Sequence, residues 1–119
     1  MVLGGGKMDI LPNFDKIVIP IEKFTKYALN EDNSPNKAVA FDLALGYNIT
    51  NAELLIENIR NNITKFPAKA RGNKGYGAIY EVAMILTGVN GRTAKVLTGW
   101  IDDDSSGEMR LVSAYVDKK

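Results

Sequence analysis

The sequence of 119 residues lacks two residue types that many enzymes use, cysteine and histidine. Without cysteine the chain forms no disulfides and no thiolate metal sites. Without histidine it lacks the usual general acid–base group and the commonest metal ligand, which disfavours a Ser-His-Asp triad and hydrolysis at a bound metal. No apolar run is long enough to span a bilayer, and no signal-peptide pattern is present. We therefore expect no membrane span, no metal and no cofactor.

Charge is balanced overall but unevenly distributed. The formal net charge is +1, which gives no global attraction to nucleic acid. Between Asn58 and Lys95, however, seven basic residues accompany a single acid, Glu81. The basic residues are Arg60, Lys65, Lys69, Arg71, Lys74, Arg92 and Lys95. Such a zone can bind phosphate groups locally, although a solvated face with scattered lysines has the same composition.

The N-terminal residues differ from the rest of the chain. Residues 1–9, which include Gly4-Gly5-Gly6, predict a flexible linker or a remnant of cloning. A triple glycine beside the ordered part indicates that the domain was cut from something longer. Residues 10–119 are then expected to form one domain, because a chain of this size and apolar content suffices for one ordinary core.

The C-terminal third predicts a three-stranded antiparallel meander. Its apolar runs cover residues 78–87, 92–101 and 108–117, and a short strand is expected near 16–19. Asn90-Gly91 between the first two runs is typical of a hairpin with a type I′ turn. Alternation with period two places Thr98 and Trp100 on one face of their strand. In the third strand it places Ser113 and Tyr115 on the same face as Met109 and Leu111.

The first half of the chain predicts helices. They are expected over residues 20–29, 35–45 and 50–66. Pro35 suits a first helical position and Gly46 a helix end, and Thr50 with Glu53 forms a capping box. Residues 68–77 predict a basic, glycine-rich loop. Because helices precede strands without alternation, we expect an α+β fold, with the N-terminal helices packed on one face of a twisted antiparallel meander and the other face partly open.

Several short motifs together resemble a known family. They are Leu11-Pro12-Asn13, Ile19-Pro20, Lys37-Ala38, Phe41, Ala44-Leu45-Gly46, Thr98-Gly99-Trp100 and Arg110-Leu111-Val112-Ser113-Ala114-Tyr115. This set resembles the C-terminal toxin domains of bacterial contact-dependent growth inhibition proteins and related polymorphic toxins. Those domains belong to the Barnase–EndoU–colicin–RelE (BECR) superfamily of ribonucleases. The resemblance spans nearly all of residues 11–117.

The resemblance implies a small ribonuclease toxin, often directed at tRNA. Such a domain is delivered as the C-terminus of a larger secreted or cell-surface protein and acts in the cytoplasm of the target bacterium. A cognate immunity protein neutralises it, and a host translation factor is a further candidate partner. The family's Thr-x-Trp pair maps onto Thr98 and Trp100, its Arg-Leu-Val-Thr-Ala-Tyr onto residues 110–115 with Ser113 in place of Thr, and its helix-start lysine onto Lys37. The family's usual histidine shortly before that lysine is missing from residues 30–36.

Metal-independent transesterification of RNA requires a deprotonated 2′-hydroxyl, a stabilised phosphorane and a protonated 5′-oxygen. Placed cations can supply much of the rate electrostatically. The catalytic candidates are Lys37 as general base, Thr98 and Ser113 as hydrogen-bond donors, and Arg110 as a phosphate clamp. The substrate-binding candidates are Arg71, Lys74, Tyr80, Arg92, Lys95, Trp100 and Tyr115.

Each of these residues also has a plain structural interpretation. Lys37 would be an exposed first-turn lysine, Thr98 and Ser113 ordinary strand residues, and Trp100 part of the core. Arg110 would pair with the acidic loop Asp102-Asp103-Asp104. The alternatives to a tRNA-cleaving toxin are a non-enzymatic protein-binding module of a phage or secreted polymorphic protein, and a nucleic-acid binder without activity.

Overall fold

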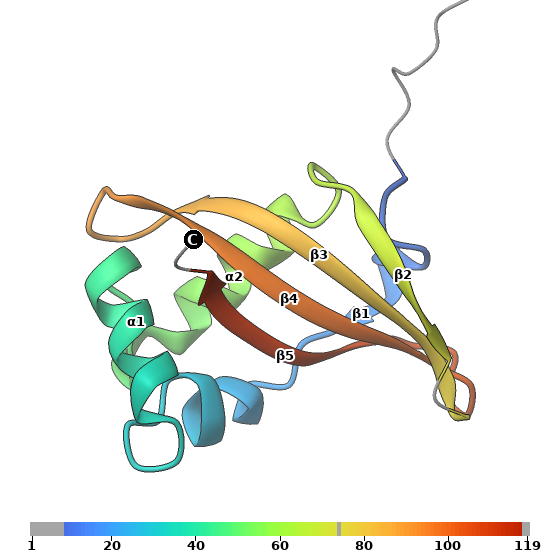
Figure 1. Ribbon diagram of the computed structural model, residues 1–119, viewed down its shortest axis with the longest axis horizontal. Coiled ribbons are helices and arrows are strands. Elements are labelled where there is room, and N and C mark those ends of the chain that lie inside the picture. The colour runs from blue at the N-terminus through green and yellow to red at the C-terminus, as the bar shows by residue number, and fades with distance from the viewer. Residues whose placement is uncertain (1–8, 74, 118–119) are drawn as a thin grey trace, which may run out of the picture.

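Five strands form one mixed sheet in the order β1-β5-β4-β3-β2, as the computed structural model shows (Figure 1). The structure describes residues 9–73 and 75–117. The strands are β1 (Ile17–Val18), β2 (Ala68–Asn73), β3 (Gly77–Thr87), β4 (Thr93–Asp103) and β5 (Met109–Asp117). The pairs β2–β3, β3–β4 and β4–β5 are antiparallel, and β1 runs parallel to β5. The predicted meander is confirmed, but the sheet is larger and mixed.

The helices all lie on one face of this sheet (Figure 1). They are the π-helix η3 (Lys23–Ala28) and the α-helices α1 (Pro35–Leu45) and α2 (Ala52–Asn62), with short 3₁₀ turns η2 (Phe14–Lys16) and η4 (Ile49–Asn51). Helix α1 packs against β5 and β4, α2 against β3, and η3 against β5. The α+β class predicted from the order of the elements is therefore confirmed. No helix in the described part of the chain is long and apolar enough to cross a membrane.

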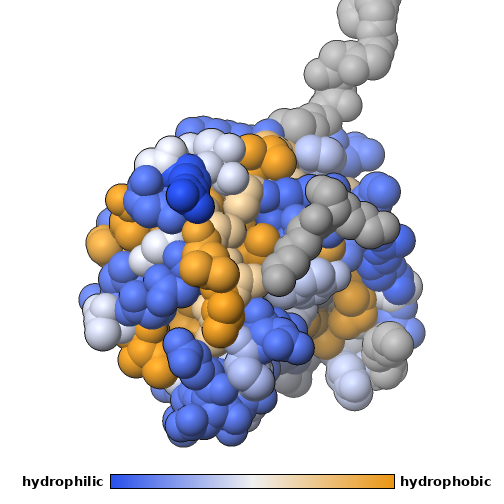
Figure 2. Space-filling model, turned by 60° about the vertical axis from the view of Figure 1, so that its left-hand side comes forward, coloured by the Kyte–Doolittle hydropathy of each residue, from blue (hydrophilic) through white to orange (hydrophobic). Residues whose placement is uncertain are grey.

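Helix α1 has the bounds predicted from its end signals. Pro35 takes the first helical position, and the backbone N–H of Gly46 donates to the Asp42 carbonyl at 2.9 Å to close the last turn. The side that packs on the sheet includes Phe41 and Leu45. Val39 and Leu43 are exposed on the same helix, and Figure 2 shows apolar surface on this side of the molecule. The apolar surface of α1 is therefore not confined to its buried face.

The start of α2 differs from the sequence-based expectation. Asn48, rather than Thr50, caps this region, because its side-chain oxygen accepts from the Thr50 backbone N–H at 2.9 Å. The Asn48 N–H in turn donates to the Asn51 side-chain oxygen at 2.8 Å, which completes a capping box. The predicted box of Thr50 with Glu53 is wrong, because the intervening 3₁₀ turn moves the cap two residues earlier. The helix ends at Asn62, four residues before the predicted end.

The β3–β4 turn is a hairpin turn, but not of type I′. Within this turn only Gly91 has a positive φ, of 82°. A type I′ turn needs a positive φ at Asn90 as well. The Gly91 N–H donates to the Gly88 carbonyl at 3.1 Å, and the Gly88 N–H donates to the Arg92 carbonyl at 2.8 Å. This arrangement is a three-residue loop whose last residue is left-handed, the other common way to join two twisted strands.

Residues 68–77, predicted as a loop, contain the edge strand β2. Ala68, Lys69 and Ala70 pair with Val82, Glu81 and Tyr80 of β3. The register shifts between Ala70 and Asn73. Charged residues, an irregular register and a glycine are typical of edge strands, because these features block pairing with a further chain. They also remove the apolar alternation by which a strand is recognised in a sequence.

A β-bulge in β5 decides which side chains reach the open face. Gly99 pairs with Ser113, but the next residue, Trp100, pairs with Leu111, so Val112 has no partner on β4. An extra residue reverses the alternation beyond it. Met109 and Leu111 consequently face the helices and Ser113 and Tyr115 the open side, whereas the sequence predicted all four on one face. That prediction is wrong because strict period-two alternation does not anticipate a bulge.

The core lies between the helices and the sheet. Its largest fully buried side chains come from both layers and include Trp100, Phe24, Phe41, Leu55, Ile59, Met84, Leu86 and Leu111. The opposite face of the sheet carries no helix (Figure 1). This open face is where the chain can present side chains to a ligand.

Candidate functional site

A cavity of about 200 Å³ lies on the open face of the sheet. Its lining comes from β2, β3, β4 and β5 and includes Arg71, Glu81, Gly99, Ser113 and Tyr115. The register explains this convergence, because Glu81 pairs with Gly99 and Gly99 pairs with Ser113 across three adjacent strands. Side chains directly opposite each other share a face. Glu81 and Ser113 therefore lie on the same face on either side of Gly99, and the missing side chain of Gly99 leaves a gap between them.

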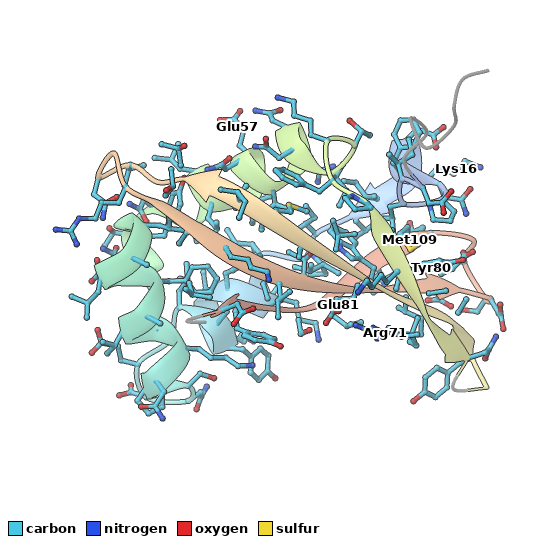
Figure 3. The ribbon with its side chains drawn as sticks, turned by 45° about the horizontal axis from the view of Figure 1, so that its top comes forward. Lys16, Glu57, Arg71, Tyr80, Glu81 and Met109 are labelled. Carbon is cyan, nitrogen blue, oxygen red and sulfur yellow. The ribbon has the colours of Figure 1, made fainter. Side chains whose placement is uncertain are left out.

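Arg71 and Glu81 form an ion pair at the edge of this cavity. The Arg71 Nη2 lies 2.6 Å from the Glu81 Oε1. Figure 3 shows the two side chains pointing toward each other from β2 and β3. The side chains are 51% and 31% exposed, and an exposed pair of this kind contributes only about 0–1 kcal/mol to stability. Both charges consequently remain accessible to a ligand in the cavity.

Ser113, Tyr115 and Lys37 form the other side of the site. A Cβ on Gly99 would lie 2.6 Å from the Ser113 Oγ, so the Ser113 hydroxyl lies directly over this glycine. Lys37 is exposed in the first turn of α1, and its Nζ lies 5.7 Å from the centre of the Tyr115 ring. A cation over an aromatic face is attracted to the ring quadrupole. The ring therefore holds the Lys37 ammonium at the border of the open face.

Thr98 and Trp100, which the sequence grouped with Ser113, lie on the opposite side of the sheet. Both are fully buried. The Trp100 Nε1 donates to the Thr98 Oγ1 at 2.8 Å, and the Thr98 hydroxyl donates to the Val82 carbonyl at 2.8 Å. Their polar groups thus satisfy one another inside the core, as buried polar groups must. Thr98 and Ser113 do not face the same way, so they do not converge on one phosphate.

Arg110 belongs to an acidic loop rather than to the cavity. Its guanidinium lies 2.8 Å from the Glu108 Oε1 and 4.0 Å from the Asp103 Oδ2. The hydroxyl and the backbone N–H of Ser105 both donate to the Asp103 carboxylate. These hydrogen bonds, with a smaller contribution from Arg110, lower the pKa of Asp103 below its usual value. This geometry matches the alternative interpretation in which Arg110 pairs with the acidic loop.

Of the remaining substrate-binding candidates, Tyr80 also borders the open-face cavity, whereas Arg92 and Lys95 do not line it. Tyr80 pairs with Trp100, packs against the core and borders a separate hollow with Ala68 and Ala70. Arg92 lies in the β3–β4 turn, and the Lys95 Nζ lies 3.5 Å from the Asp117 Oδ2. Lys74 lies outside the described residues. Of the predicted site residues, the structure therefore brings together Lys37, Arg71, Ser113 and Tyr115.

Glu81 is the functional candidate that the sequence-based prediction missed. It is the carboxylate that lines the cavity among the described residues. A signal for it exists in the sequence, since Glu81 is the single acid among seven basic residues between Asn58 and Lys95. Elsewhere in residues 9–73 and 75–117, no three acidic side chains gather in a way that could hold a metal ion. The site can thus offer one proton acceptor, cations and hydroxyl donors.

Comparison with known proteins identifies the family of the chain but does not assign it an activity. No curated protein and no solved structure matches the chain. The model of DUF6883, described as a domain of unknown function, matches residues 10–118. The match leaves out only the first nine residues and the last one. The chain therefore belongs to the DUF6883 family.

Proposed function

We propose that this domain is a metal-independent endoribonuclease toxin that cleaves tRNA or another structured RNA on the open face of its sheet. The observation that carries the proposal is the cavity in which Glu81 and Arg71 face Ser113 and Tyr115, with Lys37 beside them. The proposal further holds that the domain is the C-terminus of a larger delivered protein, that it acts in the cytoplasm of a target bacterium, and that a cognate immunity protein neutralises it.

The side chains of the site match the three requirements of transesterification. Glu81 accepts the proton of a 2′-hydroxyl, and the freed oxygen attacks the adjacent phosphorus. Arg71 and the Ser113 hydroxyl donate to the non-bridging oxygens, whose negative charge grows in the phosphorane. The bond from phosphorus to the 5′-oxygen then breaks, and the Lys37 ammonium donates the proton that this oxygen needs. The products are a 2′,3′-cyclic phosphate and a free 5′-hydroxyl.

The architecture supports the same proposal. Helices that precede an antiparallel sheet and cover one of its faces are what the resemblance to the Barnase–EndoU–colicin–RelE ribonucleases implies. We propose that the four antiparallel strands β2 to β5 have the arrangement of that superfamily, with β1 added at the β5 edge. Tyr115, 38% exposed on the open face, would stack on a base, a contact that contributes about 1–3 kcal/mol per base.

The direct test is incubation of the purified domain with bacterial tRNA in buffer containing EDTA. We expect discrete fragments that end in a 2′,3′-cyclic phosphate, because the proposed chemistry uses the RNA's own 2′-hydroxyl and no metal. Induction of the domain in a bacterium should also arrest growth. Salt-dependent binding of RNA without products would instead identify a nucleic-acid binder. The absence of both RNA binding and products would favour a protein-binding module.

Gly99→Ala should lower the cleavage rate about 10- to 100-fold without unfolding the domain. The added Cβ occupies the space of the Ser113 Oγ, 2.6 Å away, and turns this hydroxyl out of the site. A hydrogen bond to a charged group contributes about 1.5–3 kcal/mol, which sets the size of the loss. The kcat/KM for tRNA measures the first effect, and the thermal midpoint the second.

The matched control is the same change in a Ser113→Ala background. Because Gly99→Ala acts through the Ser113 hydroxyl, it should cause little further loss once that hydroxyl is gone. A full additional loss in the double variant would show that Gly99 matters for another reason, and would remove Ser113 from the proposed site.

A further inference from the structure

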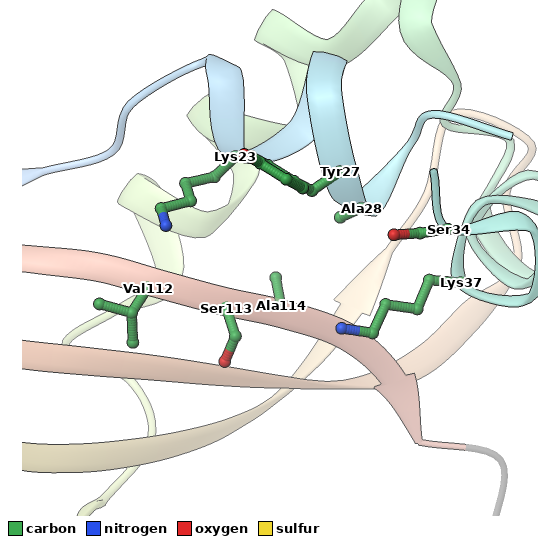
Figure 4. Close-up of a pocket in the computed structure, with 8 residues that line it drawn as sticks. All are labelled: Lys23, Tyr27, Ala28, Ser34, Lys37, Val112, Ser113 and Ala114. Carbon is green, nitrogen blue, oxygen red and sulfur yellow. The ribbon is translucent and has the colours of Figure 1, made fainter. Parts of the chain in front are cut away.

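A second cavity lies beside the proposed site and has the lining of an anion site. It measures about 210 Å³ and lies between η3, the start of α1 and β5. Figure 4 shows Lys23 and Lys37 extending from the two helices toward β5, with Ser113 between them along the strand. The other polar side chains of the lining are Tyr27 and Ser34, and no carboxylate borders the cavity. Every ionic group of this lining is therefore a cation.

Among the described residues, no carboxylate neutralises either lysine of this cavity. In the part of the chain that the structure describes, neither Lys23 nor Lys37 lies within ion-pair distance of a carboxylate. The Lys23 Nζ lies 5.8 Å from the centre of the Tyr27 ring, and Lys37 makes the same kind of contact with Tyr115. Aromatic rings orient a cation without cancelling its charge. Two like charges around one cavity are unfavourable until an anion enters between them.

Hydrogen-bond donors complete this lining. Ser34 precedes α1 at the N-cap position, yet its side chain makes no capping hydrogen bond to the helix. Its hydroxyl is thus available to a ligand in the cavity. β1 pairs with β5 only at Met109 and Arg110, so no described strand covers the edge of β5 along this cavity. The hollow is consequently open to an extended, negatively charged chain.

The position of the second cavity indicates which anion it takes. Val112 and Ser113 line both cavities, so the lysine cavity lies next to the one that holds Glu81 and Arg71. We propose that the lysine cavity binds a second phosphodiester of the same RNA strand, next to the one being cleaved. This assignment rests on the proposed function, because it takes the neighbouring cavity as the place of the scissile phosphate. Lys23, which the sequence-based prediction did not include, is then a substrate-binding residue.

The test is the affinity of Lys23→Ala for short 2′-O-methyl RNAs, which bind but cannot be cleaved. With a trinucleotide that contains two phosphodiesters, we expect a several-fold weaker affinity that falls less steeply as salt is added, because one ionic contact is gone. With a dinucleotide that contains one phosphodiester, the variant should match the wild type. NMR titration measures both affinities, and neither depends on catalysis.

Lys26→Ala is the matched control. Lys26 lies on the same helix η3 and is exposed, but it does not line the cavity. Equal behaviour of the Lys23 and Lys26 variants would overturn the proposal, as would an equal loss for the dinucleotide, which would place Lys23 at the scissile phosphate itself. Binding of inorganic phosphate that depends on Lys23, with unchanged trinucleotide affinity, would assign the cavity to free phosphate instead. A wild type that cleaves no RNA but shows the expected Lys23 effect would disprove the ribonuclease and leave the phosphodiester subsite standing.

Discussion

Replacing Glu81 by glutamine should lower the rate of RNA cleavage by about 10²- to 10⁴-fold, the usual contribution of a general base. Glutamine keeps the size of the side chain but cannot accept the 2′-hydroxyl proton. The chain has no histidine to take over this role. Glu81 is the one carboxylate that lines the open-face cavity among the described residues, and none lines the lysine cavity. The ion pair with Arg71 is exposed, so its loss should change the free energy of unfolding by only about 0–1 kcal/mol.

Glu57→Gln provides the matched control for this prediction. The substitution removes the same charge, but Glu57 is exposed on α2, on the helix side of the molecule and away from the Arg71–Glu81 pair (Figure 3). The Glu57 variant should cleave tRNA as the wild type does. Near-normal rates in the Glu81 variant would assign the base to another group.

The parts of the fold that follow from local chemistry could be predicted from the sequence. Apolar alternation gave the three central strands, and Pro35 with Gly46 gave both ends of α1. These signals work because each depends on a few neighbouring residues: a ring that fixes φ, a residue that tolerates positive φ, and a side chain that alternates between two faces. The same reasoning gave helices on one face of the sheet.

The site could be predicted only in part, because it depends on register. A single extra residue, Val112, turns Ser113 and Tyr115 away from Thr98 and Trp100. The motif residues that looked like one constellation are therefore divided between the core and the open face. The sequence predicts a loop at Arg71, but the edge strand β2 places this residue against Glu81. Pairing between strands that are distant in sequence brings these charges together, and no local pattern in the sequence encodes it.

Trp100→Ala should destabilise the domain by about 3–5 kcal/mol, the usual cost of removing a fully buried aromatic side chain. The indole is 0% exposed, so its removal leaves a cavity between the helices and the sheet. The change also removes the indole N–H, which donates a hydrogen bond to the Thr98 Oγ1 at 2.8 Å. A loss of this size is a large fraction of the stability of a small domain, about 5–15 kcal/mol. Urea unfolding followed by circular dichroism measures it, since the chain's one tryptophan is absent from the variant.

Trp100→Phe separates this structural role from base stacking. Phenylalanine retains most of the buried volume and costs only the indole hydrogen bond, about 1–3 kcal/mol including any group left unpaired, so the variant should stay folded. A phenylalanine at position 100 lies on the helix side of the sheet, as the tryptophan does, and neither side chain can reach a nucleotide on the open face. RNA affinity should therefore equal that of the wild type, whereas Tyr115→Leu, on the open face, should lose the stacking contribution of about 1–3 kcal/mol. If Trp100→Phe weakened RNA binding while Tyr115→Leu did not, the nucleotide would lie on the helix side of the sheet, and the assignment of the site to the open face would be wrong.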